Sequence, residues 1–250
     1  MNSFWIEVIM ENSNNLNRLF YFQFHDYMYE QGFVFVKKYN IFMKCINKLL
    51  LQYIFPERLF SYTKGNVCFA IAGSIRSVYS DSFEKKNLIT ETIRNNNCLC
   101  KKGEVDAKSD FEYNDENAES VMKMAFEEAK MGILSLFDEV TEINQYFDYC
   151  KYINPLQIFG ATSFRGDSLS LIVYNDKDDM IDVLSKTLER LGIDKHNEKL
   201  YKLYYSSLVE DIAGERDKVF NNPELYACAM KEAERRKTAN LEILKQNGLL

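Results

Sequence analysis

The chain of 250 residues contains two histidines and no uninterrupted apolar run as long as a membrane span. Its densest apolar region, Ile41 to Phe55, is broken by polar residues, whereas a bilayer helix needs about 20 apolar residues. The opening stretch MNSFWIEVIMENSN has neither the basic region nor the small-residue cleavage site of a secretory signal. His25 and His196 are too far apart in sequence to support a His-based metal site. We therefore expect a cytoplasmic protein with no membrane partner and no bound metal.

A surplus of positive charge is also lacking. Lysine and arginine number 31 against 37 acidic residues, which gives a net charge of −6. Nucleic-acid binding requires basic side chains gathered on one face, so we expect no nucleic-acid partner. The apolar share of 46% and the charged share of 27% are typical of a globular domain.

Six cysteines without a secretory signal indicate free thiols in a reducing compartment. Cys98 and Cys100 form a C-x-C pair with no second pair to complete a zinc site. Neither a phosphate-binding Walker loop nor another cofactor motif is present, so we expect no cofactor. The remaining four cysteines lie in apolar surroundings and are predicted to be small core residues: Cys45, Cys68, Cys150 and Cys228.

Local signals predict two helices with clear ends. Apolar residues recur at intervals of three and four from Asn14 to about Gln31, and Gly32 follows as a stop signal. The last helix has Asn222 as its N-cap, Pro223 at its first position and Gly248 as its stop. The sequence therefore predicts two helices, one from Asn14 to about Gln31 and one that begins at Pro223.

The stretch between Asn40 and Phe55 has two interpretations. As a single helix, its apolar residues would wrap most of the surface. As strands, Asn40 to Ile46 and Leu49 to Phe55 are β-branched and aromatic segments joined at Asn47-Lys48, where asparagine tolerates positive φ. Pro56 then closes the second strand, and VCFAIAGSI supplies a third. We favour the hairpin.

This order of elements carries a family resemblance. A helix ending in EQGF, strands reading NIFMK and GNVCFAIAGSI, and a helix reading GILSLFDEV resemble the bacterial family catalogued as domain of unknown function 4304. The resemblance covers roughly Asn14 to Tyr152 and rests on these positions: Gly32, Phe33, Phe42, Lys44, Phe69 and Leu136-Phe137-Asp138. It implies a small cytosolic α+β bacterial domain with no assigned activity, and hence no functional residues to carry over.

The predicted fold class is α+β, with a small antiparallel sheet of three or four strands flanked by helices and a helical C-terminal half. We expect an N-terminal arm over residues 1–13 and an α+β domain over 14–154. A polar stretch over 80–117 is predicted to be a mobile loop within that domain. A helical region over 155–250 is expected to pack on it.

The sharpest catalytic motif is Gly166-Asp167-Ser168-Leu169, the four-letter nucleophile block of the GDSL hydrolases. Such an enzyme needs a serine activated by a histidine that an aspartate orients. His196 is the only later histidine, and Asp194 precedes it by two residues where the family has three. An N-cap at Asp167 explains the same letters. A serine hydrolase using Ser168 and His196 is therefore the alternative, and we expect no catalytic residues.

His25 shares a helix face with Arg18, Tyr21, Phe22 and Tyr29. This face is a candidate binding surface, because tyrosine and arginine are favoured interface anchors. A structural alternative is an amphipathic helix lying over the sheet with His25 at its rim. The function predicted from sequence is a non-enzymatic cytosolic protein, immunity-like or regulatory, that binds another cytosolic protein.

Overall fold

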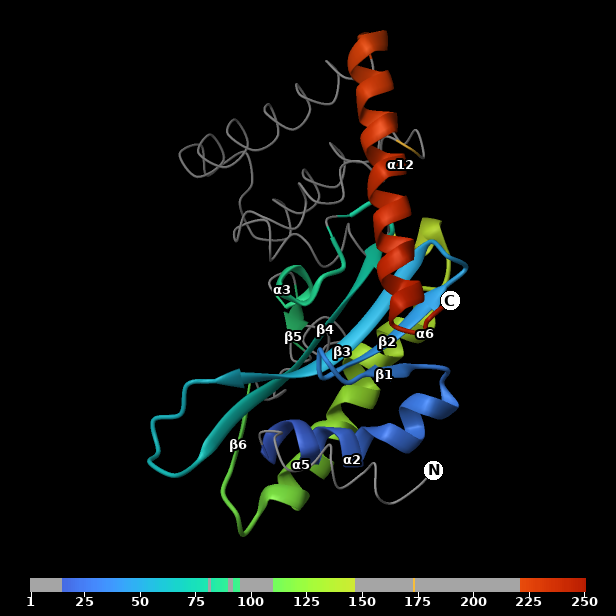
Figure 1. Cartoon of the computed structure of the whole chain (residues 1–250). Coiled ribbons are helices and arrows are strands. Elements are labelled where there is room, and N and C mark those ends of the chain that lie inside the picture. The colour runs from blue at the N-terminus through green and yellow to red at the C-terminus, as the bar shows by residue number, and fades with distance from the viewer. Residues whose placement is uncertain (1–14, 81, 90–91, 95–109, 147–172, 174–220) are drawn as a thin grey trace, which may run out of the picture. The chain divides into compact units, whose positions relative to one another are not determined.

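The computed structural model describes residues 15–80, 82–89, 92–94, 110–146, 173 and 221–250 (Figure 1). The chain is α+β, as predicted. It divides into two compact units. The first unit comprises 1–75, 88–141 and 244–250, and the second comprises 76–87 and 142–243.

Helix α2 (Asn15–Glu30) confirms the first predicted helix. Its fully buried residues recur every four positions and form one row: Leu16, Phe20, Phe24 and Met28. Gly32 ends the helix with φ +79°, and its N–H donates to the carbonyl of Tyr29 while the Phe33 N–H donates to that of Met28. This is the Schellman arrangement, in which glycine takes the left-handed conformation at low cost.

Strands β1 (Val34–Val36), β2 (Ile41–Ile46) and β3 (Leu50–Leu59) form an antiparallel meander, so the hairpin prediction is confirmed. Asn47 and Lys48 have φ of 50° and 57°, as a tight hairpin turn requires. Leu49 belongs to this turn, because Ile46 pairs with Leu50.

Pro56 does not close β3, contrary to the sequence prediction, and the strand continues to Leu59. The pairing of β3 with β2 ends at Ile54. Pro56 therefore lies where β3 has no β2 residue opposite it, and a missing N–H is tolerated at such an edge.

The sheet has six strands, so the expected three or four was wrong. Strand β4 (Val67–Ser77) lies beside β3 and also pairs with the short strands β5 (Ile93–Arg94) and β6 (Phe111–Tyr113). Strands of two or three residues are too short to show an alternating pattern. With helix α3 (Lys85–Leu88), β5 and β6 lie in the 80–117 stretch that was predicted to be a loop.

Helices α5 (Ala118–Ala129) and α6 (Ser135–Glu139) are joined by one π-helical turn, η1 (Lys130–Leu134). Ile133 of this turn faces Gly73 of β4, where a Cβ atom would meet the Tyr53 carbonyl oxygen and lie 2.9 Å from Ile133 Cδ1. The absence of a side chain at Gly73 therefore lets the helical segment approach the sheet closely.

Gln52 attaches α6 to the sheet. Its side chain is 1% exposed, and its Nε2 donates to the carbonyl oxygens of Phe137 at 2.6 Å and Val140 at 2.9 Å. Carbonyls at a helix C-terminus lack partners within the helix. The buried amide supplies that partner and fixes where the helix ends.

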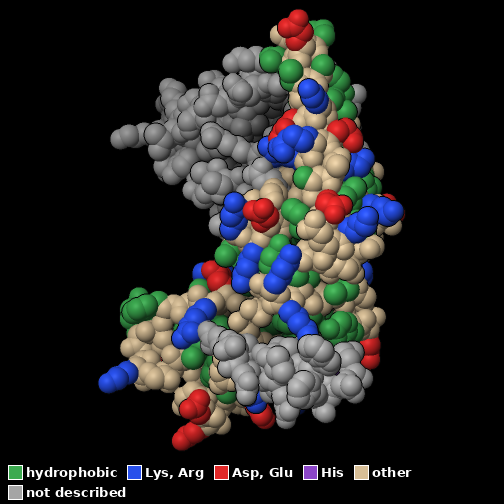
Figure 2. All heavy atoms as spheres, in the orientation of Figure 1, with side chains coloured by type: hydrophobic (Ala, Val, Ile, Leu, Met, Phe, Trp, Pro, Cys, Tyr) green, Lys and Arg blue, Asp and Glu red, His purple; other side chains and the backbone are tan. Residues whose placement is uncertain are grey.

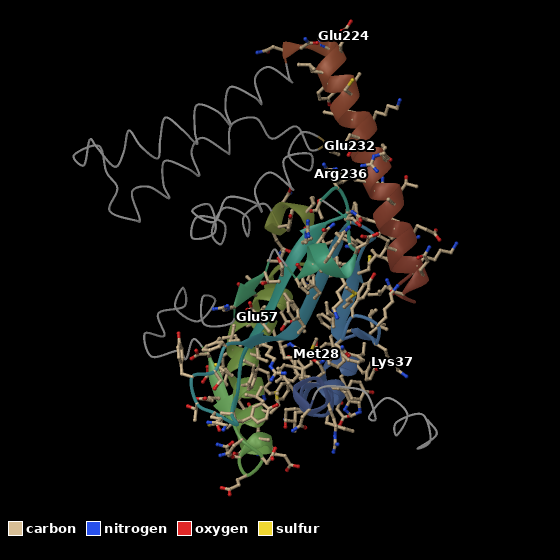
Figure 3. The ribbon with its side chains drawn as sticks, turned by 60° about the vertical axis from the view of Figure 1, so that its left-hand side comes forward. Met28, Lys37, Glu57, Glu224, Glu232 and Arg236 are labelled. Atoms are coloured by element: carbon tan, nitrogen blue, oxygen red, sulfur yellow. The ribbon has the colours of Figure 1, made fainter. Side chains whose placement is uncertain are left out.

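Helix α12 (Pro223–Gln246) confirms the last predicted helix. Asn222 Oδ1 accepts from the Glu224 and Leu225 N–H groups, and Gly248 with φ +74° ends the helix. Glu232 and Arg236 form an ion pair one turn apart on this helix, with Arg236 Nε and Glu232 Oε1 3.0 Å apart (Figure 3). Of the region 155–250, only residue 173 and 221–250 lie among the described residues.

Asn240 of α12 makes buried polar contacts with the segment after β4, within the second unit. Its side chain is 1% exposed, its Nδ2 donates to the carbonyls of Val78 and Ser80, and its Oδ1 accepts from the Phe83 N–H at 2.9 Å. One buried amide thus satisfies three backbone groups of the segment after β4.

Among the described residues, no helix combines the length and apolar character that a membrane crossing requires. The longest described helix, α12, is amphipathic, and its fully buried positions include Ala233 and Asn240.

Replacing Gln52 by methionine is expected to lower the free energy of unfolding by about 2 kcal/mol or more, because the carbonyls of Phe137 and Val140 lose their donor while buried. Urea denaturation measures the change. The matched substitution Gln31→Met, at an exposed position, should shift stability by less than about 0.5 kcal/mol. Equal midpoints for the two variants would show that the Gln52 bonds contribute nothing.

Candidate binding surface

The outward side of α2 carries a continuous group of rings. Phe22 is 45% exposed and Tyr29 is 41% exposed, while Tyr21 and His25 are half-buried between them. Phe35 of β1 extends the group onto the sheet. We call these five residues, Tyr21, Phe22, His25, Tyr29 and Phe35, the aromatic surface.

Ring contacts connect the members of the aromatic surface. Tyr21 is central: its ring centroid lies 5.8 Å from Phe22, 5.3 Å from His25 and 4.8 Å from Phe35. His25 continues the series to Tyr29 at 5.9 Å. These spacings are those of attractive aromatic pairs, which hold the rings in defined positions.

The buried row of α2 fixes this surface from beneath. Phe20 lies 5.6 Å from Phe42 of β2, and Phe24 lies 4.8 Å from Phe126 of α5. Tyr21 stacks on Phe42 with an angle of 3° between the ring planes. Because the helix is packed on both the sheet and α5, it cannot rotate without breaking these contacts.

His25 occupies the middle of the surface. Its Nε2 lies 3.0 Å from Asp26 Oδ1, and the Asp26 side chain is 88% exposed. Its Nδ1 is buried without a hydrogen-bond partner. The ring is thus covered by its aromatic neighbours on one side and reaches solvent near Asp26 on the other.

Burial raises the pKa of Tyr21 to about 12, and a hydrogen bond with Tyr29 adds to the shift. The negative charges that ionised Tyr29 and Asp26 would place nearby act in the same direction. Tyr21 therefore presents a neutral hydroxyl well above neutral pH.

The arrangement of rings and polar tips suits binding. Aromatic rings with polar tips can cover an apolar patch on a partner while their hydroxyls and imidazole form hydrogen bonds. Among the described residues, no three His, Cys, Asp or Glu side chains come together as metal ligands would. The aromatic surface contains no serine or cysteine that His25 could activate.

Some of the residues predicted from sequence lie together in the structure, and others lie outside the described residues. His25, Tyr21, Phe22 and Tyr29 come together as expected, and Arg18 is exposed on the same helix one turn earlier. Helix α2 does lie over the sheet, so the structural alternative also describes its buried side. Ser168 and His196, like Cys98, Cys100 and Cys150, lie outside the described residues.

The expectation that the remaining cysteines are core residues holds only in part. Cys68 is buried, Cys45 is half-buried and Cys228 is exposed. Cys228 lies near the start of α12, where Leu225, 45% exposed, and Ala227 are exposed as well. Apolar neighbours in sequence therefore do not make this a core position.

Sequence reasoning missed two groups. Phe35 was not included in the surface, although its place in VFV, opposite Phe42, brings it beside Tyr21. Phe60 and Tyr62, which follow β3, were not identified as surface residues, yet they are 77% and 95% exposed. Their occurrence as two aromatic residues in an otherwise polar connection could have indicated this second group.

Comparison of the chain with protein-family models, with curated proteins and with solved structures gave no match in any of the three. The resemblance to domain of unknown function 4304 over Asn14 to Tyr152 therefore stays a prediction from its motifs.

The raised pKa of Tyr21 predicts a pH dependence. Between pH 10 and pH 12 the unfolded state loses the Tyr21 proton while the folded state keeps it, so stability should fall as pH rises. The substitution Tyr21→Phe should flatten this fall, as measured by urea denaturation at successive pH values. An unchanged slope would show that Tyr21 titrates as freely in the folded protein as in the unfolded chain.

Proposed function

We propose that this protein is a non-enzymatic, cytosolic bacterial protein that binds another protein through the aromatic surface of α2 and β1. By binding its partner, the protein regulates or neutralises that partner's activity, which is a regulatory or immunity-like role. The observation that carries the proposal is the connected set of Tyr21, Phe22, His25, Tyr29 and Phe35, with two of its members more than 40% exposed.

The composition of this surface supports a protein partner. Tyrosine and phenylalanine are enriched at the centres of protein interfaces, and the exposed Arg18 adds a residue type that anchors them. Aromatic side chains have few rotatable bonds, so immobilising them costs little conformational entropy. The packing of Phe20 and Phe24 beneath them has already fixed the backbone that carries them.

The two described thiols that are at least partly buried, those of Cys45 and Cys68, also favour a non-enzymatic role. Burial raises the pKa of Cys45 and of Cys68, and the Asp110 carboxylate raises that of Cys68 further. A raised pKa keeps a thiol protonated, and the protonated thiol is a poor nucleophile.

The expected result of affinity capture from the native cytosol is one enriched protein that depends on the aromatic surface. The double variant Phe22→Ser, Tyr29→Ser removes its two most exposed rings. With the captured protein purified, calorimetry should show affinity reduced by about 30-fold or more, the effect of losing a single interface hot spot.

The matched control is Met124→Ser with Met131→Ser, which removes two apolar side chains, 46% and 55% exposed, from α5 and η1. It should bind as the unmodified protein does. Equal losses in the two double variants would contradict the assignment of the interface to α2. Hydrolysis of simple acyl esters that is lost in Ser168→Ala and in His196→Ala would contradict the non-enzymatic class.

A further inference from the structure

The connection between β3 and β4 presents two aromatic residues to solvent. These strands have 10 and 11 residues, the longest in the sheet, and hydrophobic side chains gather at the tip of their hairpin (Figure 2). Phe60 is 77% exposed and Tyr62 is 95% exposed. Their rings contact edge to face, with centroids 5.1 Å apart.

Hydrogen bonds give the tip a defined shape. Ser61 Oγ donates to Glu112 Oε1 at 2.6 Å, and it accepts from the Thr63 N–H at 3.2 Å. The Asn66 N–H donates to the Thr63 carbonyl, and Gly65 allows the turn with φ +90°. The two rings therefore project from an ordered turn, so little ordering remains to be done when they bind.

Positive charges flank the rings. Arg58 and Lys64 are both exposed, so basic and aromatic residues alternate at positions 58, 60, 62 and 64. Glu112 accepts a hydrogen bond from Ser61 of the turn, and this bond is the chief cause that lowers the pKa of its carboxyl. Glu57, which precedes Arg58, is paired with Arg94. The tip thus combines an apolar pair, two cations and one bonded carboxylate.

We propose that this tip inserts Phe60 and Tyr62 into the headgroup region of a phospholipid bilayer, with Arg58 and Lys64 contacting lipid phosphates. Two rings bury about 150–250 Å² each, well short of the roughly 800 Å² per partner in a stable protein interface. A bilayer surface needs no complementary pocket, and it accommodates aromatic rings at headgroup level with basic side chains beside them.

This contact is peripheral. The expectation of no membrane partner rested on the absence of a spanning segment, a different kind of association. Because the whole chain carries a net charge of −6, the rings supply most of the affinity and the two cations add a preference for anionic lipid.

Sedimentation of the full chain with vesicles of phosphatidylcholine, with and without phosphatidylglycerol, tests the proposal. The unmodified protein should bind, more tightly when phosphatidylglycerol is present. Phe60→Ser with Tyr62→Ser should weaken binding by about tenfold or more. Arg58→Gln with Lys64→Gln should reduce the preference for phosphatidylglycerol by about fivefold per charge.

Met124→Ser with Met131→Ser serves as the control for loss of exposed apolar side chains elsewhere, and it should sediment as the unmodified protein does. Circular dichroism verifies that every variant is folded. Absence of vesicle binding by the unmodified protein would overturn the proposal, as would equal weakening in the control. Capture of a protein that needs Phe60 and Tyr62, without vesicle binding, would assign the tip to a protein partner instead.

Discussion

The row of Leu16, Phe20, Phe24 and Met28 determines how α2 is oriented, and the candidate binding surface depends on that orientation. Residues four apart lie nearly above one another on a helix, so four large apolar side chains at this spacing give the helix one buried side. The contacts of Phe20 with Phe42 and of Phe24 with Phe126 attach that side to the sheet and to α5. The residue directly after each buried position then faces solvent or lies at the edge of the buried side of the helix.

The sheet beneath α2 is itself fixed by buried polar contacts. Gln52 and Tyr53 are neighbours on β3 and point to opposite faces of the sheet. Gln52 holds α6 through two carbonyls, and the Tyr53 hydroxyl donates to the Leu88 carbonyl at 2.9 Å. Each bond would leave buried polar groups unsatisfied if it were broken, so these contacts favour one arrangement of the helices over alternatives with similar apolar burial.

Much of the fold was predictable where the signal is local. Gly32 and Gly248 mark the two helix ends because only the adjacent backbone is involved, and Asn47 marks its turn for the same reason. The partners of Gln52 lie 85 and 88 residues away, so its capping role has no local signature. The four helical members of the aromatic surface followed from the helical period, whereas Phe35 joined them only through strand pairing.

Site-specific photo-cross-linking tests most directly whether the outward side of α2 is the contact surface. A photoreactive phenylalanine analogue would be placed at Phe22 in one protein and at Met124 of α5 in another, both exposed positions of the first unit. Position 22 is expected to cross-link to one cytosolic protein, and position 124 is expected not to. Equal cross-linking from both positions, or none from position 22 while that protein remains bound, would contradict the assignment of the contact surface to α2.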